Sequence, residues 1–197
     1  MEILYYDNDI AICVKPVGVD SEHQLPSLIA ERLGGEVFTV HRLDMNVGGV
    51  MVYARTKSAA AALSKGITDG SFVKEYYAQV YGTPDDSGIF QDLLFKDKSK
   101  NKVFVVKRER KGVKKASLEY ARITDINTSP SLVRIKLHTG RSHQIRVQFA
   151  SRGFALLGDG KYGAKDNLPA PRLYSCKLTF NLFGKTHSFE STPDWAK

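Results

Sequence analysis

The chain has 197 residues, and its 29 Lys and Arg residues exceed its 21 Asp and Glu residues, which gives a formal net charge of +8. Hydrophobic residues make up 42% and charged residues 25%, values that are ordinary for a globular protein and exclude a disordered or fibrous one. No apolar run approaches the roughly 18 residues that a membrane-spanning helix needs. The N-terminus lacks a basic region followed by an apolar stretch, and both cysteines, Cys13 and Cys176, fall in apolar runs typical of buried thiols. We therefore expect a cytoplasmic protein with no membrane association.

Short β-branched or alternating runs dominate the chain and predict strands. They lie at residues 3–6, 10–14, 37–41, 50–54, 72–81, 103–107, 116–123, 131–138, 172–181 and 187–190. Helical patterns are fewer, and they lie at residues 26–33, 57–67 and 142–152. Because a few helices are scattered irregularly among many strands, we expect an α+β fold with a mixed, largely antiparallel sheet, and not a repeating βαβ fold.

The positive charge is concentrated in residues 96–115, which hold ten basic and two acidic residues, while the rest of the chain is formally neutral. Residues 96–102 are polar and loop-like. Residues 103–106 and 116–120 predict two strands joined by a turn at Gly112, and so a basic-tipped hairpin that projects as an arm. Such an arm is typical of a polyanion-binding surface, because Lys and Arg release condensed counterions from phosphates. The alternative is a solubilising charged loop.

A first candidate for chemistry is the polar connection after the predicted strand at residues 37–41, which carries His41, Arg42 and Asp44. Loops held by strands often display reactive side chains. The structural alternatives are an Asx turn for Asp44 and a hydrogen-bonded histidine at a strand end for His41. No Ser or Cys in a nucleophile context accompanies these residues, so they form neither a catalytic triad nor a metal signature.

A second candidate is the alternating strand at residues 74–82, which places Lys74, Tyr76, Ala78 and Val80 on one face. Tyr76 would then point inward. One interpretation is a core tyrosine with a bonded hydroxyl. The other is a phenol that stacks on a base or acts in proton transfer.

A third candidate covers residues 137–149, where a strand, a turn at Gly140 and a helix follow one another. On this helix Arg146 lies between two apolar stripes. An unpaired buried guanidinium is very costly, so Arg146 needs a carboxylate partner, and we expect Asp44 to provide it. The alternatives are pairing with another acid or extension of the side chain to solvent.

Five motifs, in this order and at these separations, resemble those of the RluA family of pseudouridine synthases. They are Lys-Pro-x-Gly at residues 15–18, His-Arg-Leu-Asp at 41–44, Lys-x-Tyr-x-Ala-x-Val-x-Gly at 74–82, Thr-Gly-Arg-x-His-Gln-Ile-Arg at 139–146 and Gly-Asp-x-x-Tyr-Gly at 158–163. The likeness covers nearly the whole chain. In two places the sequence departs from the family: Val47-Gly48-Gly49 stands where Thr-Ser-Gly is common, and Gln148 stands where a histidine is frequent.

The resemblance implies a pseudouridine synthase fold with two lobes and a central active-site cleft. It implies a single catalytic domain over residues 1–197, with residues 96–115 as a basic hairpin or loop within it. Because the first predicted strand begins within two residues of Met1, we expect no accessory N-terminal RNA-binding domain. Asp44 is then the catalytic aspartate, Arg146 its ion-pair partner, and Tyr76 the aromatic that stacks on the base and assists proton transfer. The implied reaction converts uridine in structured ribosomal or transfer RNA to pseudouridine with base flipping, and it requires no metal and no cofactor.

We expect a monomer whose partner is RNA. The residues expected to contact this RNA are His41, Arg42, Arg141, Ile145, Lys107, Arg108, Arg110 and Lys111. Two other functions remain open at this point. One is a non-catalytic RNA-binding or RNA-chaperone module on the same fold. The other is a hydrolase that uses His41 and Asp44, and a metal-dependence assay would distinguish it from a synthase, which should stay active in a chelator.

Overall fold

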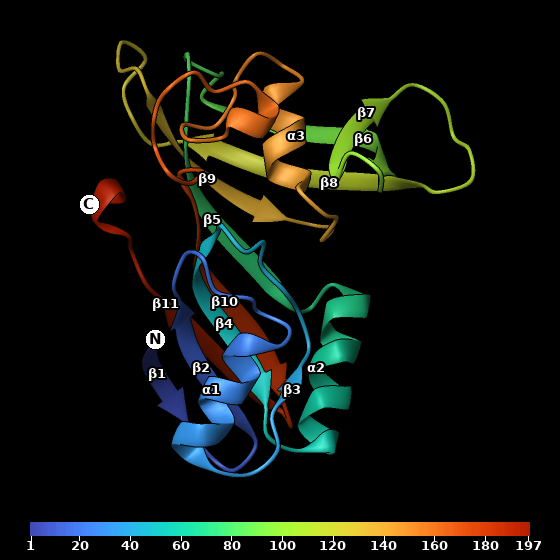
Figure 1. The fold of residues 1–197 in the computed structure, drawn as a ribbon, viewed down its shortest axis with the longest axis vertical. Coiled ribbons are helices and arrows are strands. Elements are labelled where there is room, and N and C mark those ends of the chain that lie inside the picture. The colour runs from blue at the N-terminus through green and yellow to red at the C-terminus, as the bar shows by residue number, and fades with distance from the viewer. The chain divides into compact units, whose positions relative to one another are not determined.

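The computed structural model describes all of residues 1–197, which form two compact units. Unit 1 comprises Met1–Glu75 and Tyr174–Lys197, and unit 2 comprises Tyr76–Leu173. Figure 1 shows that each unit combines helices with strands, so the predicted α+β class is confirmed. No helix is both long enough and apolar enough to cross a membrane.

Unit 1 is built on a sheet whose strands follow the order β1-β2-β4-β10-β11, with the short β3 paired to β4. The pair β4–β10 is parallel, whereas β1–β2, β2–β4, β3–β4 and β10–β11 are antiparallel, as expected for a mixed and largely antiparallel sheet. The strands are β1 (Glu2–Tyr6), β2 (Ile10–Lys15), β3 (Phe38–Thr39), β4 (Gly48–Ala54), β10 (Leu173–Leu182) and β11 (Lys185–Glu190). The helices are α1 (Gln24–Leu33), α2 (Lys57–Asp69) and the 3-10 helix η2 (Asp194–Ala196).

The core of unit 1 lies between its sheet and α2. Every residue of β4 is buried, and Val50 and Val52 pack in one cluster with Ala59 and Leu63 of α2. Tyr53 points to the opposite face, where its hydroxyl donates to the carbonyl of Ser21 at 2.7 Å. Burial on both faces explains why the sequence of β4 is almost continuously apolar instead of alternating.

Unit 2 contains strands in the order β5-β9-β8-β6-β7. Figure 1 shows α3 lying over this sheet. The helix is fixed there by aromatic packing, because the rings of Phe90 on β6, Tyr120 on β8 and Phe149 on α3 have centroids 4.8 to 5.3 Å apart. The elements are β5 (Val73–Val80), β6 (Ser87–Asp97), β7 (Lys102–Val106), β8 (Val113–Arg122), β9 (Ser131–Leu137), α3 (Gln144–Ala150) and the 3-10 helix η1 (Gly160–Tyr162).

The predicted hairpin within residues 96–115 is wrong in its pairing. Strand β7 pairs with β6, and β8 pairs with the other edge of β6, so β7 and β8 are not neighbours. Strand β6 was not predicted, because Gly88, Gln91 and Asp92 interrupt its apolar residues and break the alternation. Residues 107–112, which we call the basic loop, therefore form a connection from one side of β6 to the other and not a hairpin tip.

The other predicted elements are present with shifted ends. Helix α3 is shorter than predicted at both ends, and it begins at Gln144 because His143 takes a φ of 50° and cannot continue a right-handed helix. Helix α2 extends from Lys57 to Asp69, since the Thr56 side chain accepts a hydrogen bond from Ala59 at its start and Gly70 ends it in the left-handed conformation.

Candidate active site

Asp44 lies in the connection between β3 and β4, and the backbone on both sides of it is anchored within unit 1. The Ser21 hydroxyl donates to the Leu43 carbonyl at 2.9 Å and accepts from the Leu43 amide at 3.3 Å. On the other side, the Met45 carbonyl accepts from the Gly18 amide at 2.9 Å. The half-buried Asp44 side chain is thus carried by a loop that is held at two points, as a preorganised reactive group requires.

Lys15 adds a positive charge to this loop. It is fully buried, and its ammonium donates to the carbonyls of Pro16 at 2.9 Å and Met45 at 3.0 Å. Burial lowers the pKa of Lys15 to about 8, and the carboxylates of Asp20 and Asp44 act in the opposite direction. Lys15 was not predicted as a site residue, because a lysine at the end of an apolar run is typical of a strand that reaches the surface.

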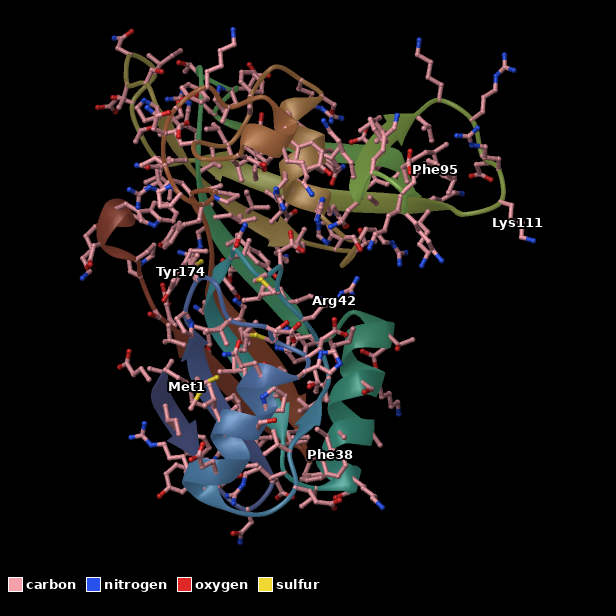
Figure 2. All side chains as sticks on the ribbon, viewed as in Figure 1. Met1, Phe38, Arg42, Phe95, Lys111 and Tyr174 are labelled. Atoms are coloured by element: carbon pink, nitrogen blue, oxygen red, sulfur yellow. The ribbon has the colours of Figure 1, made fainter.

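His41 and Arg42 occupy the same connection but differ in environment. The His41 Nε2 accepts from the Val52 amide at 3.2 Å, and its ring packs against Phe72 at 5.5 Å. Burial lowers the pKa of His41 to about 3, so the ring is neutral at physiological pH. These contacts favour the structural interpretation of His41, and its contact with substrate stays a prediction. Arg42, which is labelled in Figure 2, is exposed. Its guanidinium pairs with the Glu22 carboxylate at 3.3 Å.

Gly48, which stands where the family commonly has Ser, and Gly49, which matches the family's Gly, lie directly after this connection. Gly49 has a φ of 123°, and a Cβ atom there would collide with the backbone of Ser175 on β10. The absence of a side chain therefore permits the close pairing of β4 with β10 beside the Asp44 loop.

Arg146 lies on α3 in unit 2 and is enclosed, as its position between apolar stripes predicts, with 7% exposure. Its guanidinium forms two hydrogen bonds with the Asp159 carboxylate, each 2.7 Å long, and its carbon lies 5.2 Å from the centroid of the Tyr162 ring. A bidentate carboxylate partner offsets the cost of burying the charge. Asp159 is thus a partner of Arg146 that was not predicted from the sequence, while the pairing of Arg146 with Asp44 stays a prediction.

The turn before α3 is hydrogen-bonded to β8, and these contacts fix the position of the helix that carries Arg146. The Gln144 side chain accepts from the Thr139 hydroxyl at 2.7 Å and donates to the Ser117 carbonyl at 3.0 Å. The Arg141 Nε donates to the Lys115 carbonyl at 3.0 Å, which brings Arg141 to the C-terminal end of the positively charged residues 96–115. Ile145 is buried with 3% exposure, so in unit 2 it contributes to packing, and its contact with substrate stays a prediction.

Gln148, the other departure from the family, lies on the buried face of the same helix. Its side chain donates to the Asp92 carboxylate at 2.7 Å and to the Phe90 carbonyl at 3.3 Å, both on β6. Asp92 also pairs with Arg152 at 2.9 Å. This substitution therefore belongs to the contacts between α3 and the sheet.

Tyr76 begins unit 2 on β5. Tyr76, Ala78 and Val80 are all buried, which confirms that these alternate residues share an inward face. The role of the Tyr76 ring toward a substrate stays a prediction.

The basic loop presents its cations to solvent: Lys107, Arg108, Arg110 and Lys111 are all exposed. Figure 2 shows Lys111 pointing away from the sheet, and the Arg110 guanidinium lies 4.6 Å from the centroid of the Phe95 ring. No group of three or more His, Cys, Asp or Glu side chains is arranged to hold a metal ion. An exposed cationic surface such as the basic loop suits contacts to phosphates.

Comparison with known proteins identifies relatives of this sequence. The RNA pseudouridylate synthase family model matches residues 9–151. The chain is 31% identical to the dual-specificity RNA pseudouridine synthase RluA of Escherichia coli K12, over 98% of this chain and 93% of that protein. It is 29% identical to the ribosomal large subunit pseudouridine synthase D of Zymomonas mobilis and 32% identical to an RNA pseudouridine synthase of Aquifex aeolicus, and spans only 56% and 64% of their lengths. The resemblance to the RluA family is thus confirmed.

Solved structures support the same fold. The human RNA pseudouridylate synthase domain containing 4 aligns with a TM-score of 0.81 at 22% identity, covering 98% of this chain and 89% of that one. The human RNA pseudouridylate synthase domain containing 1 aligns with a TM-score of 0.82 at 21% identity, covering 98% and 83%. The predicted fold is therefore confirmed.

Proposed function

The chain belongs to the RNA pseudouridylate synthase family, and on this premise we propose that it converts uridine in RNA to pseudouridine, with Asp44 as the catalytic carboxylate. The observation that carries the proposal is the anchored Asp44 loop, which lies inside the matched residues 9–151 together with Tyr76 and Arg146. A loop held by Ser21 and Gly18 supports a carboxylate in a defined place, which proximity catalysis requires.

The proposed reaction is an isomerisation. The bond between the ribose C1′ and the uracil N1 breaks, the base turns, and a bond forms between C1′ and C5. The proton lost from C5 is balanced by one taken up at N1, so no oxidant, reductant or group donor is consumed. In this proposal Arg146 pairs with the Asp44 carboxylate, and Tyr76 stacks on the base and assists the proton transfer.

The proposed substrate is structured ribosomal or transfer RNA. The relatives' names support an RNA substrate, because one is a ribosomal large subunit pseudouridine synthase and another a dual-specificity RNA pseudouridine synthase. The target uridine must leave its stack to reach a protein carboxylate, which costs a few kcal/mol and favours loops and bulges. The exposed cations of the basic loop would contact phosphates, and Arg42 and Arg141 are proposed as further RNA contacts. We further propose a cytoplasmic monomer.

The test is the variant Asp44→Asn, assayed with RNA identified by mapping pseudouridines in cells with and without the gene. We expect no pseudouridine from Asp44→Asn, while RNA binding stays within a few-fold of the wild type. Asp125→Asn, which changes an exposed carboxylate in another loop, is the matched control and should keep full activity. Full turnover by purified Asp44→Asn would exclude Asp44 as the catalytic group. A wild-type protein that binds RNA but forms no product would favour the non-catalytic RNA-binding module.

A further inference from the structure

The short 3-10 helix η1 joins two parts of unit 2 on which the proposed function depends. Asp159, which immediately precedes η1, holds Arg146 through two hydrogen bonds of 2.7 Å. Tyr162, the last residue of η1, places its ring centroid 5.2 Å from the Arg146 guanidinium carbon and 5.2 Å from the Lys102 ammonium. One aromatic ring therefore contacts both the buried arginine and the first residue of β7.

The Tyr162 hydroxyl makes a second set of contacts. It accepts a hydrogen bond from the Val103 amide at 2.9 Å and lies 2.9 Å from the His143 Nδ1, at the start of α3. Strand β7 is at the edge of its sheet, so the hydroxyl satisfies an amide that has no strand beside it. Val103 is only 2% exposed, which leaves that amide poor access to water.

A further contact strengthens the link between η1 and β7. The Lys161 ammonium donates to the carbonyl of Asn101, in the turn between β6 and β7, at 3.0 Å. Thus η1 contacts Asn101, Lys102 and Val103 on one side and Arg146 on the other. The basic loop begins at the far end of the same strand, β7.

We propose that Tyr162 is a positioning residue, which orients the Arg146 guanidinium by fixing η1 to β7 and to the start of α3. This inference rests on the proposed function, since Arg146 is there the partner of the catalytic carboxylate. The Tyr162 ring and the Asp159 carboxylate fix the orientation of the Arg146 guanidinium, and the hydrogen bonds of the Tyr162 hydroxyl fix the position of the ring. Displacing a positioned group by about 1 Å can lower the rate of the catalysed reaction on the order of 100-fold. Even partial release of the Tyr162 ring should therefore slow the reaction.

The test is Tyr162→Phe, which keeps the ring and removes only the hydroxyl. Tyr5→Phe is the matched control, because Tyr5 is also half-buried and its hydroxyl donates to a side chain, that of Asp7, at 2.7 Å in unit 1. The first measurement is the NMR signal of the Arg146 Nε–H group and its exchange with water, which requires no turnover. The second is kcat and KM for pseudouridine formation.

We expect Tyr162→Phe to shift the Arg146 signal, to speed its exchange at least several-fold, and to lower kcat about tenfold with KM within twofold. Tyr5→Phe should change none of these. An Arg146 signal and kcat that both match the wild type would overturn the positioning role, as would a loss confined to KM. If the wild type forms no pseudouridine, the proposed function fails, and the NMR comparison still decides whether Tyr162 positions Arg146.

Discussion

Replacing Asp159 by Asn should destabilise the protein by about 3–5 kcal/mol, because the Arg146 guanidinium would stay buried without this carboxylate. The side chains of the pair are only 9% and 1% exposed, and the closest nitrogen–oxygen distance is 2.7 Å. Asparagine keeps the volume of aspartate but replaces one accepting oxygen by an amino group that would face the arginine donors. Water cannot readily replace the lost acceptor at a site with this little exposure.

The expected change is large relative to the free energy of unfolding, which is typically about 5–15 kcal/mol for a folded protein. Since about 1 kcal/mol corresponds to roughly 2–4 °C in Tm for a chain of this length, we expect Tm to fall by roughly 6–20 °C. Urea unfolding and thermal melting followed by circular dichroism measure both quantities on the purified variant.

The matched control is Glu119→Gln, which removes a carboxylate from a pair with Lys136 whose side chains are 41% and 45% exposed. Exposed pairs contribute about 0–1 kcal/mol, so this variant should unfold almost as the wild type does. Replacing both buried partners, by Arg146→Met with Asp159→Leu, should restore part of the stability, because the buried guanidinium is removed together with the carboxylate that it binds. A loss in Asp159→Asn no larger than in Glu119→Gln would refute the reasoning.

Replacing the four cations of the basic loop by Gln should make the fall of log affinity for RNA with log salt less steep, by roughly one unit of slope per lost phosphate contact. An unchanged slope, or an equal change in a control with Lys57 and Lys65 of α2 replaced, would show that the loop is a solvated surface. Stability should also depend on pH through His41, whose pKa is lowered from 6.5 to about 3 by burial. Below pH 6.5 the unfolded chain binds a proton that the folded chain does not, so this group lowers the free energy of unfolding by about 1.4 kcal/mol per pH unit between about pH 5.5 and 4. His41→Gln, which keeps an acceptor for Val52, should reduce the slope by that amount in urea titrations, and an unchanged slope would contradict the buried neutral histidine.

Local patterns in the sequence determined the α+β class, most strands, the enclosed position of Arg146 and the loop that carries Asp44. Each of these depends on residues close together in the chain. The inward face of Tyr76, Ala78 and Val80 follows from the two-residue repeat of a strand, and the burial of Arg146 follows from apolar neighbours about one helical turn apart. The family motifs belong to the same kind of signal, because each is a short run of residues.

Only the tertiary structure decided which strands pair and which side chains meet. Strand β6 lies between β7 and β8, so the basic residues form a connecting loop where the sequence predicted a hairpin. Asp159 reaches Arg146 from 13 residues away, and Tyr162 reaches the Val103 amide from 59 residues away. Strand pairing and buried ion pairs are set by which groups the packed core brings together, and periodicity along the chain carries no information about those distant partners.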